Sequence, residues 1–438
     1  MTFPGRKLVA GAGGRPRKVE PHAGGPRRWL VVVLALALSA AATPGHTALA
    51  RQGAPAVGAE PRQAAHIVSL VRDAMAQYDL KAVIVRVTVD GREVVTAALG
   101  ESMTGVPATT DMHFHNGAVV FSYMTTLLLV FVDQGLVRLD DPLSHWLPEL
   151  PDAERVTLRM LANMTAGYQD YVANQQLIEA FYADPFRPWT PQELIAIGLS
   201  APRVFEPGSN WAYSHTDYVI LGEALERIGG KPLATLLQEY VLAPLGLNNT
   251  ASWPTAVVPE PVLHTFSSER REQLGIPRGT RFYEEATFWN PSWTTARGAI
   301  QTTNIYDMAT TAVAVGEGTL LSRESHQAQV GPGLLGLGAP LAGCFNCATL
   351  NRDYNYGLGV VLSRSWILQN PLFAGCGAIE AYLPSRRIAI AVATTFGEQS
   401  FDEQGNYTHG NASQNVFAAI GAYLAPEDAP PQPSGRVD

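Results

Sequence analysis

The sequence predicts an α+β protein in which one antiparallel sheet is built from both ends of the chain and an all-helical region is inserted between them. Strand-like segments lie near both ends, at 82–99 and at 356–395, whereas helical periodicity dominates the residues between them. Helical segments also lie outside the strands, at 66–78 and 412–424, where they could cover the sheet. These three observations give the fold class.

The first 50 residues are expected to be an export signal and not part of the fold. Seven Lys and Arg residues precede an apolar stretch from Trp29 to Ala42, and Ala48-Leu49-Ala50 offers a small-residue cleavage site. The apolar stretch is shorter than the roughly 20 residues that a membrane span needs. We therefore expect cleavage near Ala50 and release to the cell envelope or the medium, with an uncleaved anchor as the alternative. The pair Arg27-Arg28 leaves a twin-arginine route open, and residues 51–59 are expected to be a linker.

The charge distribution argues against nucleic acid or an anionic membrane as the main partner. The chain has 31 basic and 39 acidic residues; seven and one of these lie in the predicted signal, which leaves 24 and 38, a net charge of −14, for the mature protein. A small molecule or a cell-wall-derived ligand is the expected partner. No phosphate-binding loop or dinucleotide fingerprint occurs, and His113-x-His115 lacks further ligands at metal-site spacing, so no cofactor is expected.

Cys344 and Cys347 form a CxxC motif, and Cys376 stands alone. In an exported protein this spacing favours a small loop-closing disulfide, with a zinc or redox role as alternatives. Cys376 is either buried and reduced or paired with one of the other two.

Apolar residues recur at helical spacing from His66 to Tyr78. The segments 82–89 and 93–99 flank Asp90-Gly91, which is a strong β-hairpin signal. The next helix, Val119–Phe131, is apolar nearly all the way round and should be buried, with Gly135 as its C-terminal glycine. Its N-terminus opens on a small-residue loop, where the helix dipole favours negative charge and a nucleophile would be well placed.

The rest of the chain is mostly helical until the last strands. Residues 251–290 carry few periodic signals and are expected to be a long surface excursion, a candidate lid. The remaining expected elements are a Pro-marked helical stretch at 143–250 with a helix at 218–228, a helix at 304–315, a strong strand at 387–395 and an amphipathic helix at 412–424. We expect one domain at 60–424, with a helical insert at about 112–330, and a disordered tail at 425–438.

The stretch 114–142, FHNGAVVFSYMTTLLLVFVDQGLVRLDDP, resembles the nucleophile helix of the serine beta-lactamase and D-alanyl-D-alanine carboxypeptidase/esterase family, which includes penicillin-binding-protein-like members. In that family a Phe leads into Ser-x-x-Lys, an apolar helix, a Gly and a Leu-Asp-Asp-Pro-like loop. An ungapped count places the serine position on Ala118 and the lysine position on Phe121. The resemblance covers roughly residues 60–424 and implies the beta-lactamase/transpeptidase-like fold.

The family's other two motifs are also altered. Its Tyr-x-Asn motif corresponds to Tyr213-Ser214-His215, in which Tyr213 is kept and His215 replaces Asn. Tyr213 with a lowered pKa could serve as a general base, and His215 could carry a proton near neutral pH; alternatively both are packed wall residues. The third motif, His-x-Gly, is absent between 363 and 381, where Asn370 is the best candidate for its first position.

Two serines could replace the missing nucleophile. Ser122 lies one helical turn deeper than Ala118, and Ser214 lies between Tyr213 and His215. A buried hydroxyl bonded to a backbone carbonyl is the favoured interpretation of Ser122. Both remain weak candidates for substrate contact, and no Gly-x-Ser-x-Gly elbow occurs.

The leading hypothesis is an exported pseudoenzyme of this family that retains a ligand-binding cleft. Loss of a nucleophile typically lowers the rate by about 10⁴- to 10⁶-fold. The runner-up is a carboxypeptidase- or esterase-like hydrolase of esters or amides that uses Tyr213, His215 and a substitute serine or water. The third is an envelope interaction protein with residues 251–290 as its contact surface.

Overall fold

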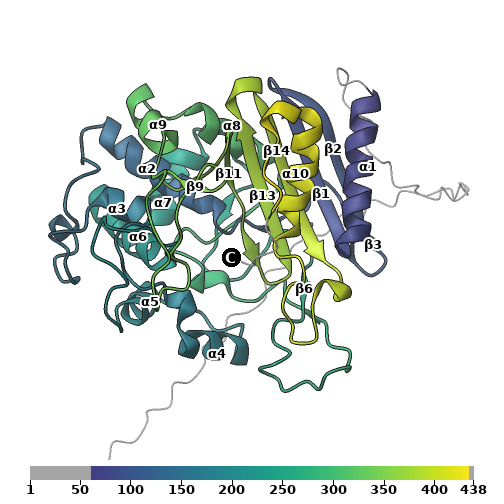
Figure 1. Ribbon diagram of the computed structural model, residues 1–438, viewed down its shortest axis with the longest axis horizontal. Coiled ribbons are helices and arrows are strands. Elements are labelled where there is room, and N and C mark those ends of the chain that lie inside the picture. The colour runs from purple at the N-terminus through teal and green to yellow at the C-terminus, as the bar shows by residue number, and fades with distance from the viewer. Residues whose placement is uncertain (1–60, 434–438) are drawn as a thin grey trace, which may run out of the picture. The chain divides into compact units, whose positions relative to one another are not determined.

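A nine-stranded antiparallel sheet forms the centre of the fold in the computed structural model, which describes residues 61–433 (Figure 1). The predicted signal at 1–50 and linker at 51–59 lie outside the described residues. The strand order is β3-β2-β1-β14-β13-β11-β10-β9, and β12 pairs with β13. No helix within residues 61–433 is both long and apolar enough to cross a membrane.

Strands from the two ends of the chain meet in the middle of this sheet. The first, β1 (Leu80–Val89), pairs with β2 (Arg92–Met103) on one side and with β14 (Ile388–Phe396) on the other. Asp90 and Gly91 both have positive φ, 49° and 72°, which is the backbone of a tight hairpin turn. The predicted sheet and the predicted hairpin are therefore confirmed.

The other strands are short except β13. In the large sheet they are β3 (Val106–Pro107), β9 (Asn355–Tyr356), β10 (Val361–Ser363), β11 (Trp366–Gln369), β12 (Leu372–Phe373) and β13 (Cys376–Leu383). A three-stranded sheet has the order β4-β8-β5, from β4 (Phe114–His115), β5 (Ala251–Ser252) and β8 (Gln301–Thr303), and β6 (Phe266–Ser267) pairs with β7 (Glu284–Glu285).

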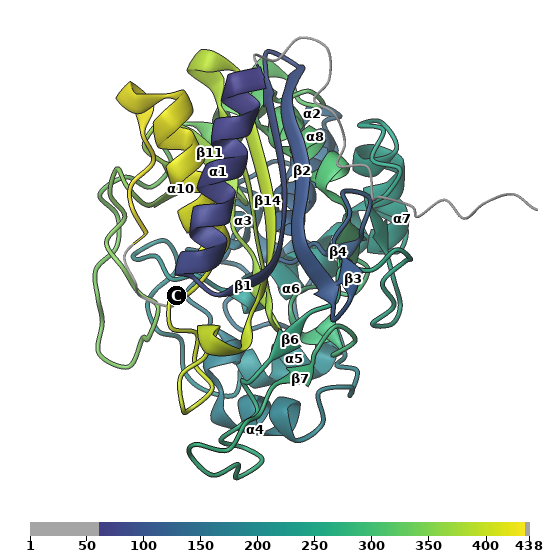
Figure 2. The same cartoon turned by 90° about the vertical axis from the view of Figure 1, so that its right-hand side faces the viewer.

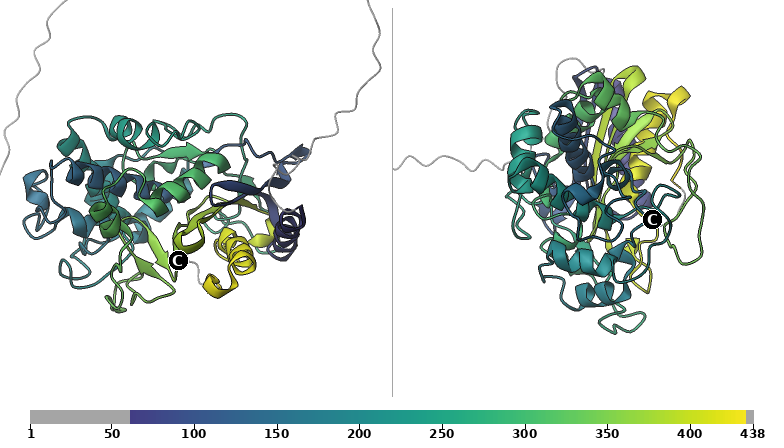
Figure 3. Two further views of the ribbon diagram at one scale, coloured as in Figure 1. Left: turned by 90° about the horizontal axis from the view of Figure 1, so that it is seen from above. Right: turned by 90° about the vertical axis from the view of Figure 1, so that its left-hand side faces the viewer.

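Helices cover both faces of the large sheet. The terminal helices α1 (Pro61–Gln77) and α10 (Ala412–Leu424) pack against one another and against one face (Figure 2). On the opposite face, α8 (Ile305–Glu317) packs on β13 and β14, and the helical region lies beyond it (Figure 3). The residues that α1 buries, Ala64, Ile67, Val71 and Ala74, recur at intervals of three or four, so one apolar stripe faces the sheet.

The helical region lies between β3 and β9 in the chain, as predicted, but the expectation that it is all-helical is wrong, because the short strands β4 to β8 also lie within it. Its helices are α2 (Val119–Asp133), α3 (Leu158–Ala162), α4 (Gln175–Ala183), α5 (Pro191–Gly198), α6 (His215–Gly229), α7 (Leu233–Leu237) and α9 (Arg323–Val330), with a π-helical turn at Gln238–Leu242. Helix α2 is buried on all sides, and Gly135 follows it with φ +70°. Both features were predicted from the sequence.

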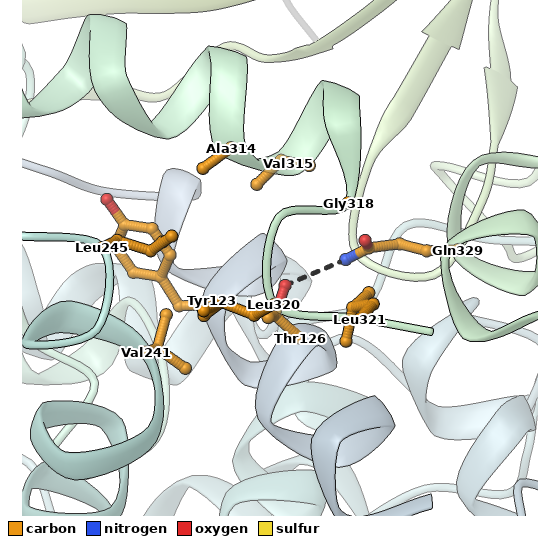
Figure 4. Close-up of a pocket in the computed structure, with 10 residues that line it drawn as sticks. All are labelled: Tyr123, Thr126, Val241, Leu245, Ala314, Val315, Gly318, Leu320, Leu321 and Gln329. Carbon is orange, nitrogen blue, oxygen red and sulfur yellow. Dashed lines mark hydrogen bonds between the residues drawn. The ribbon is translucent and has the colours of Figure 1, made fainter. Parts of the chain in front are cut away.

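Polar groups within α2 bond to its neighbours. The Tyr123 hydroxyl lies 2.6 Å from Thr311 Oγ1 on α8, and Thr125 Oγ1 donates to the Leu358 carbonyl at 2.9 Å. A cavity of about 10 Å³ lies between α2, α8 and α9, where Gln329 Nε2 donates to Thr126 Oγ1 at 3.2 Å (Figure 4). This volume admits about one water molecule. The cavity is lined by none of the predicted site residues.

Residues 251–290 are anchored at both ends, which corrects the expectation of a surface excursion. The His113 amide donates to the Pro261 carbonyl, and Trp289 is only 1% exposed. Gly375, between β12 and β13, lies very close to Phe266. A Cβ built on this glycine would lie 2.0 Å from the carbonyl oxygen of Phe266. The continuously exposed part is confined to about 272–281. Burial of apolar residues at both ends therefore fixes most of this segment.

The expectation of a disordered tail from residue 425 is wrong for residues 425–433. A 3₁₀ turn at Pro426–Asp428 brings the Asp428 carbonyl to the Trp366 indole, whose Nε1 donates to it at 2.7 Å. Arg364 Nη1 donates to the Ala429 carbonyl at 3.1 Å. The buried indole needs an acceptor, and the segment after α10 supplies it.

Candidate functional site

The loop before α2 places Ala118 at the N-cap position, immediately before the first residue of that helix. The segment is held by β4, which pairs with β8, and Ala118 is half-buried. Its methyl group makes no capping bond, and the first three amides of α2 donate instead to the backbone carbonyls of residues 116–118. Gly117 has φ +53°, and a Cβ there would lie 2.4 Å from Pro371 Cβ. Ala118 therefore lies beside the segment predicted to hold the third motif.

Phe121, one turn deeper in α2, is buried within aromatic packing. Its side chain is 1% exposed and stacks on Tyr218, with ring centroids 3.9 Å apart and an interplanar angle of 25°. It also contacts the rings of Tyr213 and His215, at 6.0 and 6.1 Å between centroids. The position at which the resemblance expects a lysine is thus part of an apolar contact.

Both candidate serines are engaged in helix contacts. Ser122 is fully buried and donates to the Val119 carbonyl at 2.7 Å. Ser214 is 2% exposed, and its Oγ caps α6 by accepting from the Asp217 amide at 3.1 Å. These bonds speak against the role in substrate contact considered for both residues.

Tyr213 is unsuited to the role of a base with a lowered pKa. Burial raises the pKa of Tyr213 well above its usual value, and the neighbouring Tyr356 and Tyr354 add to the effect. Its hydroxyl is therefore neutral at ordinary pH. The expectation of a lowered pKa is wrong because no charged group within residues 61–433 offsets the desolvation of Tyr213.

His215, at the start of α6, is paired with Asp170. Its Nδ1 lies 3.1 Å from Asp170 Oδ2, and its backbone amide donates to Asp170 Oδ1 at 3.3 Å. The same Oδ1 accepts from the Val172 amide at 3.3 Å. The side chain of Asp170 is 3% exposed and that of His215 is 19% exposed. A buried carboxylate thus orients a partly accessible imidazole.

Sequence reasoning did not find Asp170. It precedes His215 by 45 residues and belongs to a different turn, Tyr171–Ala173, which its side chain caps. Its only signal is an acidic residue that follows the altered turn at 163–168.

Four aromatic rings surround the imidazole. The His215 ring centroid lies within 6.3 Å of those of Phe121, Tyr171, Tyr213 and Trp293. Trp293 also contacts Phe373 on β12, at 5.8 Å. It lies in the 3₁₀ turn Pro291–Trp293, just beyond the excursion at 251–290, and its carbonyl accepts from the Tyr171 hydroxyl at 2.7 Å. The sequence did not single out Tyr171, Trp293 or Phe373.

The third-motif segment contributes packing near Ala118. Asn370 is half-buried between β11 and β12, and its carbonyl accepts from Asn411 Nδ2 at 2.9 Å. Pro371, the next residue, contacts Gly117. Asn370 therefore lies near the predicted site, because the residue after it contacts the loop before α2. Its role as the first position of the third motif stays a prediction.

A disulfide joins Cys344 and Cys347, as predicted, and Cys376 is free and buried. Burial raises the pKa of the Cys376 thiol to about 12. Within the disulfide loop, Asn346 Nδ2 donates to the Tyr213 carbonyl, and Cys347 forms a β-bridge with Ala212. The loop thus holds the segment that carries Tyr213.

The arrangement of one sheet, two terminal helices and a helical insert beside a buried first-motif helix defines the class of protein. The model of the Beta-lactamase family matches residues 67–412, and the chain belongs to this family. The predicted family and fold are therefore confirmed.

Individual relatives match part of the chain. Penicillin-binding protein 4* of Bacillus subtilis (strain 168) is 27% identical over 164 residues, 36% of this chain and 34% of the relative. D-aminopeptidase of Brucella anthropi is 32% identical over 166 residues, 37% of this chain and 31% of the relative. The matched segments thus span about a third of these relatives' length.

Solved structures extend the likeness over most of the fold. The D-amino acid amidase of Ochrobactrum anthropi SV3, complexed with D-phenylalanine, has a TM-score of 0.66 at 21% identity and covers 82% of this chain and 98% of its own. A penicillin-binding protein of Bacillus halodurans has a TM-score of 0.62 at 17% identity, with 81% and 98% covered. At these identities the likeness shows the fold alone.

Proposed function

We propose that this protein binds a small molecule at the family's site and lacks the covalent serine chemistry. One observation carries the proposal: Phe121 stacks on Tyr218 at the position where the resemblance expects a lysine. Ala118, one turn earlier, offers no hydroxyl to acylate. An apolar ring cannot accept a proton from a nucleophile, so the Ser-x-x-Lys mechanism has neither of its two groups.

The walls of the site favour an apolar or aromatic ligand. Trp293 and Phe373 are partly exposed rings, whereas Tyr171 is buried, and His215 is the partly accessible titratable group among them. Aromatic rings bind flat apolar groups through area burial and edge contacts. A relative in Escherichia coli (strain K12) is named a D-alanyl-D-alanine-carboxypeptidase/endopeptidase, so a cell-wall peptide fragment with an apolar group is a candidate ligand. The proposal includes export, through the predicted signal at 1–50.

The proposal is tested by intact-mass measurement after incubation with a fluorophosphonate and, separately, a penicillin. We expect no adduct on the mature protein. The double variant Ala118→Ser/Phe121→Lys should gain an adduct, whereas Ala118→Ser alone should gain little because no base stands beside it. A stoichiometric adduct on the unaltered chain, mapped to Ser122 or Ser214, would overturn the proposal. A folded double variant with no adduct would refute a preserved cleft.

One observation favours the alternative that the protein binds another envelope protein through residues 251–290. A hollow of about 550 Å³ lies between the exposed part of the excursion and residues 398–403, and both Arg271 and Glu403 line it. Deletion of 272–281 is the sharper test, because the two ends of 251–290 are buried. Capture of an envelope protein that survives this deletion would exclude the segment as the contact surface.

A further inference from the structure

We propose that Asp170 and His215 act together as a general base that activates a water molecule, so that the site hydrolyses aryl esters without an acyl-enzyme. This inference rests on the proposed function, since the ester must first bind among the aromatic rings. It differs from covalent catalysis because no side chain is acylated. His215 is the proposed catalytic residue and Asp170 its positioning residue.

The hydrogen bonds fix the tautomer of His215. An ionised carboxylate only accepts, so the imidazole nitrogen that faces Asp170 Oδ2 at 3.1 Å, Nδ1, carries the proton. With its proton on Nδ1, the imidazole presents the lone pair of Nε2 on the other side of the ring. Within residues 61–433 this Nε2 has no hydrogen-bond partner, and the side chain is 19% exposed. The amide of His215, bonded to Asp170 Oδ1 at 3.3 Å, holds the two residues in register.

Among the groups around the site, the His215 imidazole is the one suited to accept a proton from the water molecule. Tyr171 and Tyr213 face it from two segments, and burial raises the pKa of each well above the usual value, so both stay neutral. Phe121 and Trp293 face it from α2 and from the turn at 291–293 and do not titrate. Asp170 is the carboxylate in contact with the ring. A second carboxyl in α6, Asp217, is fully buried, and burial raises its pKa well above the usual value.

The reaction balances with water as the only co-reactant. The water oxygen forms a bond to the ester carbonyl carbon while His215 Nε2 takes one of its protons. Collapse of the tetrahedral intermediate breaks the carbon–oxygen bond to the aryl group. The phenolate takes the proton from Nε2, which gives a phenol, a carboxylic acid and neutral imidazole.

The leaving group decides the substrate class. A phenol has a pKa near about 10, so phenolate leaves from the intermediate with little assistance. An amine leaves only after it has been protonated, and the proton for that step is the one held on His215 Nε2, which can also return to the attacking water. An amide intermediate is therefore expected to revert to substrate more often than it breaks down, whereas phenolate leaves without this proton. The ring of an aryl ester also matches the aromatic surfaces of Trp293 and Phe373. Aryl esters are therefore expected to react and anilides are not.

The test uses the mature full-length chain with phenyl acetate, p-nitrophenyl acetate and acetanilide. We expect steady turnover of both esters, no burst, no mass adduct and no anilide hydrolysis. His215→Gln should lower kcat by about 10²- to 10⁴-fold. The matched control is His264→Gln, because His264 pairs with Glu285 at 2.6 Å with a side chain 18% exposed, outside this site. The control should leave kcat unchanged.

Two further readouts separate catalysis from a structural role. Added imidazole should restore ester turnover to His215→Ala, and Asp170→Asn should lower kcat with little change in KM and displace the pH profile. Unchanged turnover in His215→Gln would overturn the inference. So would binding of benzyl methyl ketone, the carbonyl analogue of phenyl acetate, without any ester hydrolysis; this result would leave the proposed ligand binding intact. An acyl adduct on a serine would instead overturn the proposed function.

Discussion

Ala118 and Phe121, at the start of α2, occupy the positions at which the family resemblance expects a serine and a lysine, and Phe121 packs on Tyr218. The helix is buried and is followed by Gly135 with positive φ, so its packing does not require a polar pair at these two positions. Apolar side chains here need no hydrogen-bond partners in a buried place. They make the start of the helix apolar.

Phe121→Ala should lower the free energy of unfolding by about 3–5 kcal/mol, because it leaves a cavity beside Tyr218 in a well-packed cluster. Urea unfolding followed by circular dichroism measures the change. Phe186→Ala is the control, since Phe186 is 60% exposed and its loss should change stability by less than about 0.5 kcal/mol. Equal effects of the two substitutions would show that the stack adds no stability.

Glu380, on β13, makes the stability of the protein depend on pH. Burial raises the pKa of its carboxyl to about 8 from an ordinary value of 4.5. The folded state therefore holds this proton more tightly than the unfolded state. The resulting stabilisation is fully present below about pH 4.5 and is lost as the pH rises towards about 8.

Glu380→Gln should remove this dependence, because an amide does not titrate. We expect the wild-type protein to lose stability relative to the variant between about pH 5 and about pH 8. Urea unfolding at both pH values measures the difference. Parallel changes in the two proteins would contradict a buried, neutral Glu380.

At the scale of elements, the disulfide loop supports the wall that carries Tyr213. Asn346 bonds to the Tyr213 carbonyl and Cys347 bridges Ala212, so a small covalent loop fixes two neighbouring backbone positions. Closure of so short a loop contributes on the order of 2 kcal/mol. Its main consequence is therefore local.

The double variant Cys344→Ser/Cys347→Ser should fold and show faster amide hydrogen exchange in residues 210–214. Mass spectrometry of peptides from this segment measures the effect, and reduction of the wild-type protein should reproduce it. Cys376→Ser is the control, because Cys376 is free and lies on β13. Unchanged exchange at 210–214 would mean that other contacts hold the wall.

At the scale of the whole molecule, residues 425–429 fasten the segment after α10 to the sheet. This segment passes from α10 to Trp366, the first residue of β11, whose indole donates to the Asp428 carbonyl. Truncation after Leu424 should therefore lower the free energy of unfolding by about 1–3 kcal/mol, the cost of leaving a buried donor without a partner. Thermal unfolding measures it, and truncation after residue 433, which keeps these contacts, is the control.

The parts of the fold that the sequence predicted are those with a local pattern. The hairpin around Asp90-Gly91 follows from turn chemistry, and the burial of α2 follows from its apolar composition. The family resemblance rests on the order of such segments, and the family match at 67–412 confirms it. The disulfide could be predicted from the Cys-x-x-Cys spacing and the expectation of an oxidising compartment.

The α+β class, the buried helix α2 and the CxxC disulfide could be predicted from the sequence, because periodicity and short spacings are local properties. The pairing of Asp170 with His215, and the place of Trp293 in the same aromatic wall, are known from the three-dimensional structure alone. Asp170 lies 45 residues before His215 in the chain, and Trp293 lies far after it. No local sequence signal links either residue to His215. Contacts of this kind exist only after the sheet and the helical insert have folded the chain back on itself.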